Sequence, residues 1–292
     1  MMEVAITGAG GLLGRYLLKT RPVWAKTIAL WHTRHFEHIA NADFLLDITD
    51  ASAVQATLEG LRPSVLIHCA GLGDVDEVER DAEKGWSINV EATGNIVEQC
   101  GRLGIKLVYI STNAVFGGAN APYTEACPML PINTYGYQKG VAETYVRELP
   151  SALIIRPILL YGWPWEGGRS NWATRLYHSL RDGKAVNVVD DRVTQPTYAR
   201  DVAEAIWTLL HKDRCGTYNV GGADICTLFT FARKVAQVFQ LDANLVQPAK
   251  SDDFPTLAPR PINTTYDLEK LYREDIHPGG IVWGLSQMRG EQ

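Results

Sequence analysis

A glycine-rich turn between an apolar strand and a helix constrains the fold of this chain more than any other feature. Residues 4–7, Val-Ala-Ile-Thr, read as a strand, and Gly8, Gly11 and Gly14 follow at the spacing of a dinucleotide-binding turn. Gly8 allows the tight turn, Gly11 lets the backbone approach a pyrophosphate, and Gly14 lets the helix lie close to the strand. The start of the helix then offers free N–H groups to phosphate oxygens. The residues predicted to bind the pyrophosphate are Gly8, Gly10, Gly11, Leu12, Leu13 and Gly14.

Apolar runs alternate with helical patterns through the first half of the chain. The predicted strands lie at 27–31, 64–68, 106–111 and 152–156, and the predicted helices at 51–61, 82–103 and 134–149. This alternation is typical of a parallel sheet with helices on both faces. We therefore predict an α/β fold, a Rossmann-type doubly wound parallel sheet.

The character of the sequence changes beyond Pro157, where an aromatic loop, scattered prolines and short helices predict a smaller α/β substrate-binding lobe. Such a lobe would cover the carboxyl edge of the sheet, where ligands bind in open α/β folds. Trp163 and Trp165, in a Gly/Pro-rich loop, are expected to form a mobile lid. The predicted dinucleotide-binding domain is 1–157 plus about 195–220, and the predicted substrate lobe is 158–194 and 221–292.

Charge and cysteine content exclude several classes of function. A net charge of −5 argues against a nucleic-acid partner. The chain has no apolar run of about 18 residues that would span a membrane, and Met1-Met2-Glu3 does not begin a signal peptide. The cysteines show no metal-binding or disulfide spacing, which predicts a cytoplasmic protein without a metal site. They are Cys69, Cys100, Cys127, Cys215 and Cys226.

The ends of the next strands predict the cofactor. No acidic residue follows the second strand, where NAD-binding proteins place one for the ribose hydroxyls. Thr33 and Arg34 stand there instead and suit a 2′-phosphate, which favours NADP(H) and leaves NAD(H) open. Asp47 and Ile48 are expected to border the adenine. Small residues after the fourth strand, Cys69, Ala70 and Gly71, would let the cofactor lie close.

Tyr135 and Lys139 lie four residues apart in a predicted helix, and so on one face, one turn from each other. A phenol titrates near pH ~10, and a neighbouring cation lowers that pKa. Such a pair can protonate an alkoxide during hydride transfer. The spacing alone is common, so the interpretation depends on the rest of the chain.

Taken together, these features resemble the extended short-chain dehydrogenase/reductase family and, within it, the dTDP-4-dehydrorhamnose reductase group, which includes the regulatory subunit of methionine adenosyltransferase. The resemblance covers nearly the whole chain. The matching segments are the glycine turn, 62–71, Asn89-Val90-Glu91-Ala92-Thr93, 110–116, Pro122-Tyr123-Thr124-Glu125, 135–139, Gln195-Pro196-Thr197 and 260–264.

The resemblance implies a catalytic set. Tyr135 would be the proton donor, Lys139 would bind the nicotinamide ribose, and Thr112 would hold the substrate carbonyl. Ser111 is the neighbouring candidate, but alternation along a strand turns it the other way. Arg156 and Pro157 would lead the backbone past the nicotinamide. The implied reaction is an NADPH-dependent reduction of a nucleotide-activated 4-keto-6-deoxy sugar.

The substrate side departs from the family pattern at two positions. Asn113 and Ala114 replace an Asp and a Tyr that reductases of this type carry, and the loss of the Tyr is expected to shrink the pocket wall or its packing. Arg260 and Trp172 are substrate candidates, although Arg260 could simply tie the lobe together and Trp172 could belong to the core. The predicted substrate-binding residues are Asn113, Asn171, Trp172, Arg175, Thr197 and Arg260.

Two alternatives to a reductase stay open. One is a nucleotide-sugar epimerase of the same fold, which returns the hydride to its substrate. The other is a non-catalytic NADP-binding regulatory subunit, which the replacements at Asn113 and Ala114 keep in play. The sequence does not identify the sugar or the nucleotide, and it leaves open whether the protein is a homodimer.

Overall fold

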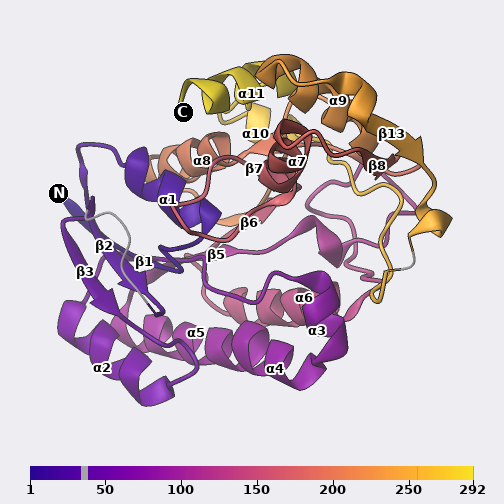
Figure 1. Cartoon of the computed structure of the whole chain (residues 1–292). Helices are drawn as coiled ribbons and strands as arrows, with labels where there is room; N and C mark the ends of the chain where they lie inside the picture. The colour runs from indigo at the N-terminus through magenta and orange to yellow at the C-terminus, as the bar shows by residue number, and fades with distance from the viewer. Residues whose placement is uncertain (34–38, 255, 292) are drawn as a thin grey trace.

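The computed structural model describes residues 1–33, 39–254 and 256–291, and it shows an α/β fold around a seven-stranded parallel sheet (Figure 1). The strand order is β11-β6-β5-β4-β1-β2-β3. This confirms the predicted doubly wound sheet. The strands are β1 (Met2–Thr7), β2 (Ala25–Trp31), β3 (Ala42–Leu45), β4 (Val65–His68), β5 (Lys106–Ile110), β6 (Leu153–Pro157) and β11 (Gly216–Val220).

The order of the strands reverses beside β1. The chain runs outward from β1 to β2 and β3, then returns to β4 on the other side of β1 and runs outward through β5 and β6. In open parallel sheets such a reversal leaves a crevice at the carboxyl ends of the two central strands. Thr7 pairs with His68 at the end of this β1–β4 ladder, so the glycine turn and Cys69 leave the sheet side by side.

Helices cover both faces of the sheet (Figure 1). One face carries α2 (Ala51–Leu61), α5 (Ala92–Leu103) and α6 (Thr134–Val146), which pack in that order. The other face carries α1 (Leu12–Lys19) and α8 (Ala199–His211), which contact each other. Two separate apolar clusters form beneath these layers, as expected for strands that are buried on both sides.

The predicted helix over 82–103 contains an irregularity that its apolar pattern does not reveal. α4 (Ala82–Trp86) passes into a π-helical turn, η1 (Ser87–Glu91), before α5 begins. Such widened turns often occur at functional sites. Here the turn carries Asn89, whose amide accepts from Leu72 N at 2.9 Å and donates to Leu72 O at 3.2 Å. These hydrogen bonds tie the helix to the loop that follows β4.

The C-terminal part of the chain lies above the α1–α8 layer (Figure 1). Its helices α7, α9 and α11 contact one another through α9, and β13 pairs with β8. The elements are β7 (Leu160–Tyr161), α7 (Trp172–Arg181), β8 (Val186–Val189), β9 (Val193–Thr194), β10 (Thr197–Tyr198), β12 (Cys226–Thr227), α9 (Leu228–Phe239), β13 (Val246–Ala249), α10 (Glu269–Tyr272) and α11 (Ile281–Gly290); α3 (Val75–Arg80) precedes α4.

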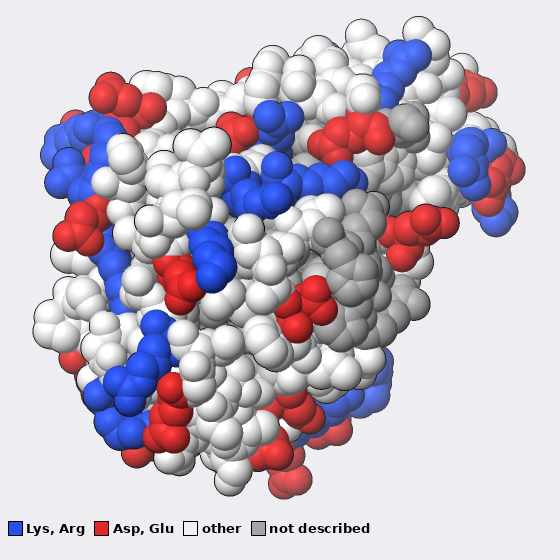
Figure 2. Space-filling view, turned by 90° about the vertical axis from the view of Figure 1, so that its left-hand side faces the viewer, with Lys and Arg blue, Asp and Glu red and all other residues white. Residues whose placement is uncertain are grey.

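Over the described residues, no helix combines the length and apolarity needed to cross a bilayer. Figure 2 shows lysine, arginine, aspartate and glutamate side chains interspersed over the face that looks left in Figure 1. All five cysteines are free thiols.

Candidate active site

The glycine turn has the close contacts that its sequence predicts. Gly8 has φ +65°, and a Cβ there would lie 2.6 Å from Ala70 N. A Cβ on Gly14 would lie 2.5 Å from Gly8 O, so only glycine allows α1 to approach the turn. α1 begins after Gly11, which gives it no side-chain cap. The first N–H groups of the helix are therefore available to an anion.

Two adjoining clefts open at this carboxyl edge of the sheet and share the glycine turn and the segment after β4. The inner cleft has a volume of about 380 Å³ and the outer one about 480 Å³. The inner cleft is lined by Gly8, Gly11, Leu12, Leu13, Gly14, Cys69, Ala70, Gly71, Asn89, Thr112, Asn113, Tyr135, Lys139, Pro157 and Asn171, among others. Thr112, Tyr135 and Lys139 thus come together beside the glycine turn.

Thr112 is held at the end of β5 by its own turn. Its hydroxyl accepts from Ala114 N at 3.1 Å and caps the 3₁₀ turn η2 (Asn113–Val115). Ser111 points the other way, as strand alternation predicts, and donates to Glu143 Oε1 at 2.6 Å. Thr112, not Ser111, shares its surroundings with Tyr135, since both line the inner cleft and Thr112 acts on the pKa of the Tyr135 phenol.

Tyr135 is partly buried in the first turn of α6, where Asn133 caps the helix by accepting from Gly136 N at 2.8 Å. Burial raises the pKa of Tyr135 above its ordinary value, and the hydrogen bond with Thr112 opposes this shift. Desolvation of the phenolate is the larger of the two effects.

Lys139 is buried one turn further along α6. Its ammonium donates to Ile110 O at 2.8 Å and lies 4.1 Å from the centroid of the Tyr109 ring. Burial lowers its pKa to about 7, and the negative charge of Glu143 acts in the opposite direction. The carbonyl and the ring hold the ammonium in the floor of the cleft.

Gly136 is a site residue that reasoning from motifs missed. A Cβ on Gly136 would lie 2.1 Å from Ala114 O, so α6 and η2 touch backbone to backbone. Only a glycine beside Tyr135 permits this contact, which brings Tyr135 to Thr112. Ala114 meets α6 through its carbonyl, and its small side chain is absent from the cleft lining.

The outer cleft contains the predicted adenine-side residues. Asp47 and Ile48 line it together with His32. Asp47 accepts from the backbone and hydroxyl of Thr49 at 2.9 and 2.7 Å, and these hydrogen bonds with Thr49 hold its pKa below the usual range. Thr33 is exposed just beyond β2, and Arg34 lies outside the described residues.

The predicted substrate residues fall into two groups. Asn113 and Asn171 line the inner cleft; Asn113 donates to Thr264 Oγ1 at 2.6 Å, and Asn171 caps α7. The others lie outside the cleft lining. Trp172 stacks on Phe231, and Arg175 is exposed and donates to Ser170 O. Thr197 is fully buried, and its hydroxyl accepts a hydrogen bond from Gly222 N at 3.0 Å. Arg260 forms an ion pair with Asp76 at 2.8 Å.

The Arg156 side chain lies outside both clefts, so any role of Arg156 beside a nicotinamide would be that of its backbone. Its side chain is fully buried on the α6 face of the sheet and binds both oxygens of Glu143, at 2.8 and 2.6 Å. Pro157, the next residue, lines the inner cleft. Gly10, in the turn, lies outside the lining of both clefts. Alternation along β6 explains why Arg156 and Pro157 face different sides.

The Trp163–Trp165 loop is anchored, which corrects its interpretation as a mobile lid. Trp165 is 2% exposed and donates from Nε1 to Ala9 O at 2.9 Å. Trp163 donates from Nε1 to Met288 O at 2.6 Å and contacts Phe239 edge to face. The Gly/Pro-rich composition suggested a mobile loop, whereas these long-range contacts hold the loop in place.

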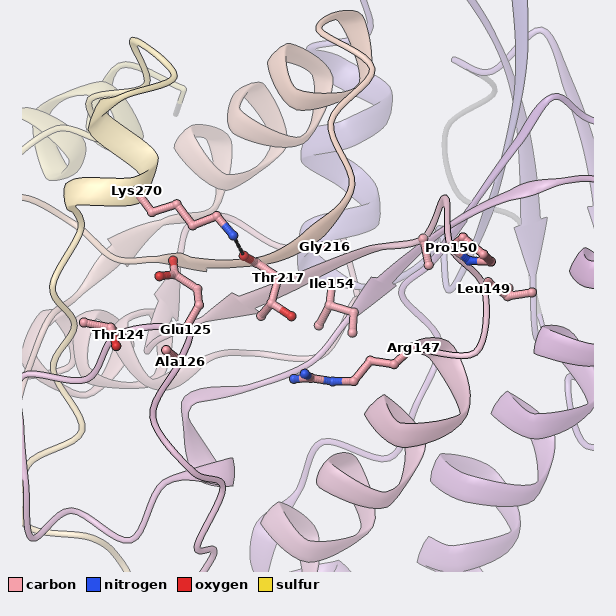
Figure 3. Close-up of a pocket in the computed structure, with 11 residues that line it drawn as sticks. Thr124, Glu125, Ala126, Arg147, Leu149, Pro150, Ile154, Gly216, Thr217 and Lys270 are labelled. Atoms are coloured by element: carbon pink, nitrogen blue, oxygen red, sulfur yellow. Dashed lines mark hydrogen bonds between the residues drawn. The ribbon is translucent and has the colours of Figure 1, made fainter.

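A further cleft of about 500 Å³ lies at the opposite end of the sheet, at the amino ends of β6 and β11 (Figure 3). Its lining includes Ile154, Thr217, Arg147 and Lys270, whose ammonium donates to Thr217 O at 2.8 Å. It contains none of the predicted site residues.

Comparison with known proteins gives consistent results over most of the chain. The family described as RmlD substrate binding domain matches residues 2–280. A probable dTDP-4,6-dihydroxy-2-methyloxan-3-one 4-ketoreductase of Streptomyces antibioticus is 33% identical over 269 residues, which cover 89% of this chain and 85% of that protein. Methionine adenosyltransferase 2 subunit beta of Mus musculus is 31% identical over 279 residues, covering 92% and 81%. Among solved structures, dTDP-4-dehydrorhamnose reductase from Bacillus anthracis str. Ames in complex with NADP has a TM-score of 0.88 at 30% identity and covers 100% of this chain and 99% of that one.

Proposed function

Because the chain belongs to the RmlD substrate binding domain family, we propose that it is an NADPH-dependent reductase of a nucleotide-activated 4-keto-6-deoxy sugar. The observation that carries the proposal is the meeting of Thr112, Tyr135 and Lys139 in one cleft beside the glycine turn. The ketoreductase and dehydrorhamnose reductase relatives support the reaction class. Family membership confirms the resemblance inferred from the motifs.

The residues of the two clefts fit a dinucleotide. A Cβ on Gly8 or Gly14 would collide with neighbouring backbone, so the turn can only be this tight with glycine. The start of α1, which has no side-chain cap, follows this turn. We assign pyrophosphate binding to the N–H groups at the start of α1, and adenine contacts to Asp47 and Ile48. The NADP-bound relative supports NADPH as the cofactor, and Arg34 with Thr33 is the proposed 2′-phosphate site.

The chemistry then divides between two hydroxyl groups. When bound, the reduced nicotinamide supplies a hydride to the keto carbon. Thr112 donates a hydrogen bond to the keto oxygen and orients it, and Tyr135 transfers its proton to that oxygen as negative charge develops. Lys139, as an ammonium, stabilises the phenolate that remains, which offsets the cost of forming a charge in a buried position. We assign substrate contacts to Asn113 and Asn171. The substrate-binding lobe is assigned to residues 158–194 and 221–292.

The test is NADPH oxidation with a dTDP-4-keto-6-deoxy sugar by the wild type and by Tyr135→Phe. Loss of general acid catalysis is expected to lower kcat about 10²–10⁴-fold, with NADPH affinity retained. A wild type that turns over no such sugar would contradict a reductase. An epimerase would instead keep its cofactor bound, with no net oxidation of NADPH, and would invert one stereocentre of the sugar.

A regulatory subunit is the second candidate, since the methionine adenosyltransferase subunit of Mus musculus is 31% identical. In that case Tyr135→Phe would leave the cellular role of the protein intact. Complementation of a strain that lacks the gene, by wild type or by Tyr135→Phe, separates the two functions.

A further inference from the structure

The face of α6 that carries Tyr135 and Lys139 continues for one more turn to Glu143. Residues spaced by four lie one above another along a helix, so all three side chains point to the sheet. Glu143 is completely buried, as is its ion-pair partner Arg156. A buried carboxylate is costly unless it is fully paired, so this cluster has to be explained.

Four hydrogen bonds satisfy the Glu143 carboxylate. Arg156 donates to both oxygens, at 2.8 and 2.6 Å, and Ser111 donates to Oε1 at 2.6 Å. Arg147, which reaches into the cleft of Figure 3, donates to Oε2 at 3.0 Å. Although burial acts to raise it, these partners hold the pKa of Glu143 below its usual range. Glu143 therefore stays negatively charged while it joins α6 to β5 and β6.

The hydrogen bonds and the charge of Glu143 act on Thr112 and on Lys139, two members of the proposed catalytic set. Ser111 immediately precedes Thr112, so the Ser111–Glu143 hydrogen bond fixes the strand end that carries Thr112. Lys139 lies one turn before Glu143, and the Glu143 charge opposes the effect of burial on its pKa. The titratable groups that face Lys139 are Tyr109 from β5, His68 and Cys69 from β4 and the segment after it, and Tyr135 and Glu143 from α6.

We propose that Glu143 is a positioning residue that holds the Tyr135 helix against the Thr112 strand end and supplies the buried negative charge that stabilises the Lys139 ammonium. This inference rests on the proposed reductase function, because Lys139 acts on the reaction through Tyr135. Arg156 and Ser111 orient the carboxylate.

The test is the pH profile of kcat/KM for Glu143→Gln. With a negative charge removed, Lys139 loses its proton at a lower pH, so activity should fall earlier on the alkaline side. We expect the variant to lose about tenfold in kcat/KM relative to wild type near pH 8 and about threefold or less near pH 6. Glu143→Asp, which keeps the charge, should restore the wild-type alkaline limb. The matched control is Glu204→Gln, which removes a carboxylate from the exposed Arg200–Glu204 pair on α8 and should leave the profile in place.

A folded Glu143→Gln protein with the wild-type alkaline limb would overturn the inference. If leaving Arg156 without a partner prevents folding, Glu143→Gln/Arg156→Met supplies a folded variant. Because it removes one charge of each sign, it tests the positioning role: kcat should fall as α6 loses its tie to β6, and a wild-type kcat would overturn that role. A direct ¹⁵N NMR titration of the Lys139 side chain needs no substrate. If the Lys139 midpoint of Glu143→Gln equals that of the wild type, the inference is refuted, whether or not the wild type reduces a sugar. If the midpoint of the variant is lower but the wild type reduces no sugar, the electrostatic role of Glu143 is supported and only the proposed reaction is rejected.

Discussion

Trp165 donates its indole proton to the carbonyl of Ala9, 2.9 Å away, and so ties the C-terminal part of the molecule to the glycine turn. The indole is buried, and its ring meets Trp31 edge to face. The turn that we propose to bind pyrophosphate is therefore braced from outside the sheet. The Trp163–Trp165 loop, whose composition suggests mobility, therefore holds the glycine turn in place.

Trp165→Phe should weaken NADPH binding several-fold and destabilise the fold by about 1–2 kcal/mol, because Ala9 O loses its donor in a buried position. Isothermal titration with NADPH and urea unfolding measure the two effects. Trp163→Phe is the matched control, since it removes a similar hydrogen bond to Met288 O, away from the turn. Equal loss of NADPH affinity in both variants would show that the turn is not the part being braced.

Gly136→Ala should separate α6 from η2, because its Cβ would lie 2.1 Å from Ala114 O and both sides of the contact are backbone. We expect about 1–3 kcal/mol of destabilisation and a loss of kcat of about 10²-fold as Tyr135 moves from Thr112. Gly140→Ala, one turn along the same helix, would place its Cβ no closer than 3.8 Å to any neighbour, Met129 Sδ being the nearest, and should fold and react as wild type. A fully active Gly136→Ala enzyme would contradict the proposed role of this contact.

His68 should make the fold sensitive to acid. Burial, and to a smaller degree the Lys139 charge, lowers its pKa from 6.5 to about 3. The unfolded chain takes up a proton below pH 6.5 and the folded one does not, so stability is lost as the pH falls from about 6.5 toward 3. His68→Gln should make the dependence of the unfolding free energy on pH shallower by about 1 kcal/mol per pH unit between about pH 4 and 6. Exposed His277→Gln is the control, and an unchanged slope in His68→Gln would refute the assignment.

Glu291→Gln should destabilise the protein by about 1–3 kcal/mol. The Glu291 carboxylate accepts from Arg15 at 3.1 Å and from Tyr16 at 3.2 Å, and it also binds the Tyr198 hydroxyl. Thermal unfolding measures the change. Glu269→Gln breaks an exposed pair with Arg273 and should cost less than about 0.5 kcal/mol, so equal losses would contradict the prediction.

Local features of the fold could be predicted, and features made by tertiary contacts could not. The strands, α6 and the glycine turn follow from short-range periodicity and from glycine spacing, and the structure contains them. The π-turn at Asn89 leaves no trace in an apolar pattern that suits either helix type. β11 is a short strand whose place in the sheet depends on its pairing with β6, a contact distant in sequence.

The same distinction applies to the site. Gly8 and Gly14 could be identified because a turn explains them locally, whereas the need for Gly136 depends on Ala114 from another element. Thr197 and Arg260 follow motifs of the family, yet their partners are Gly222 and Asp76, which periodicity does not bring together. Motifs therefore located the cleft, and packing decides which of their side chains reach it.

The contacts of Glu291 with α1 also determine when the molecule can finish folding during its synthesis. Arg15 and Tyr16 leave the ribosome early, but their carboxylate partner follows 276 and 275 positions later in the chain. At about 5–20 residues per second, the first helix waits tens of seconds for this contact. Until then the helix that begins at the glycine turn lacks its last anchor, so a nascent chain reaches its full stability only after residue 291 has emerged.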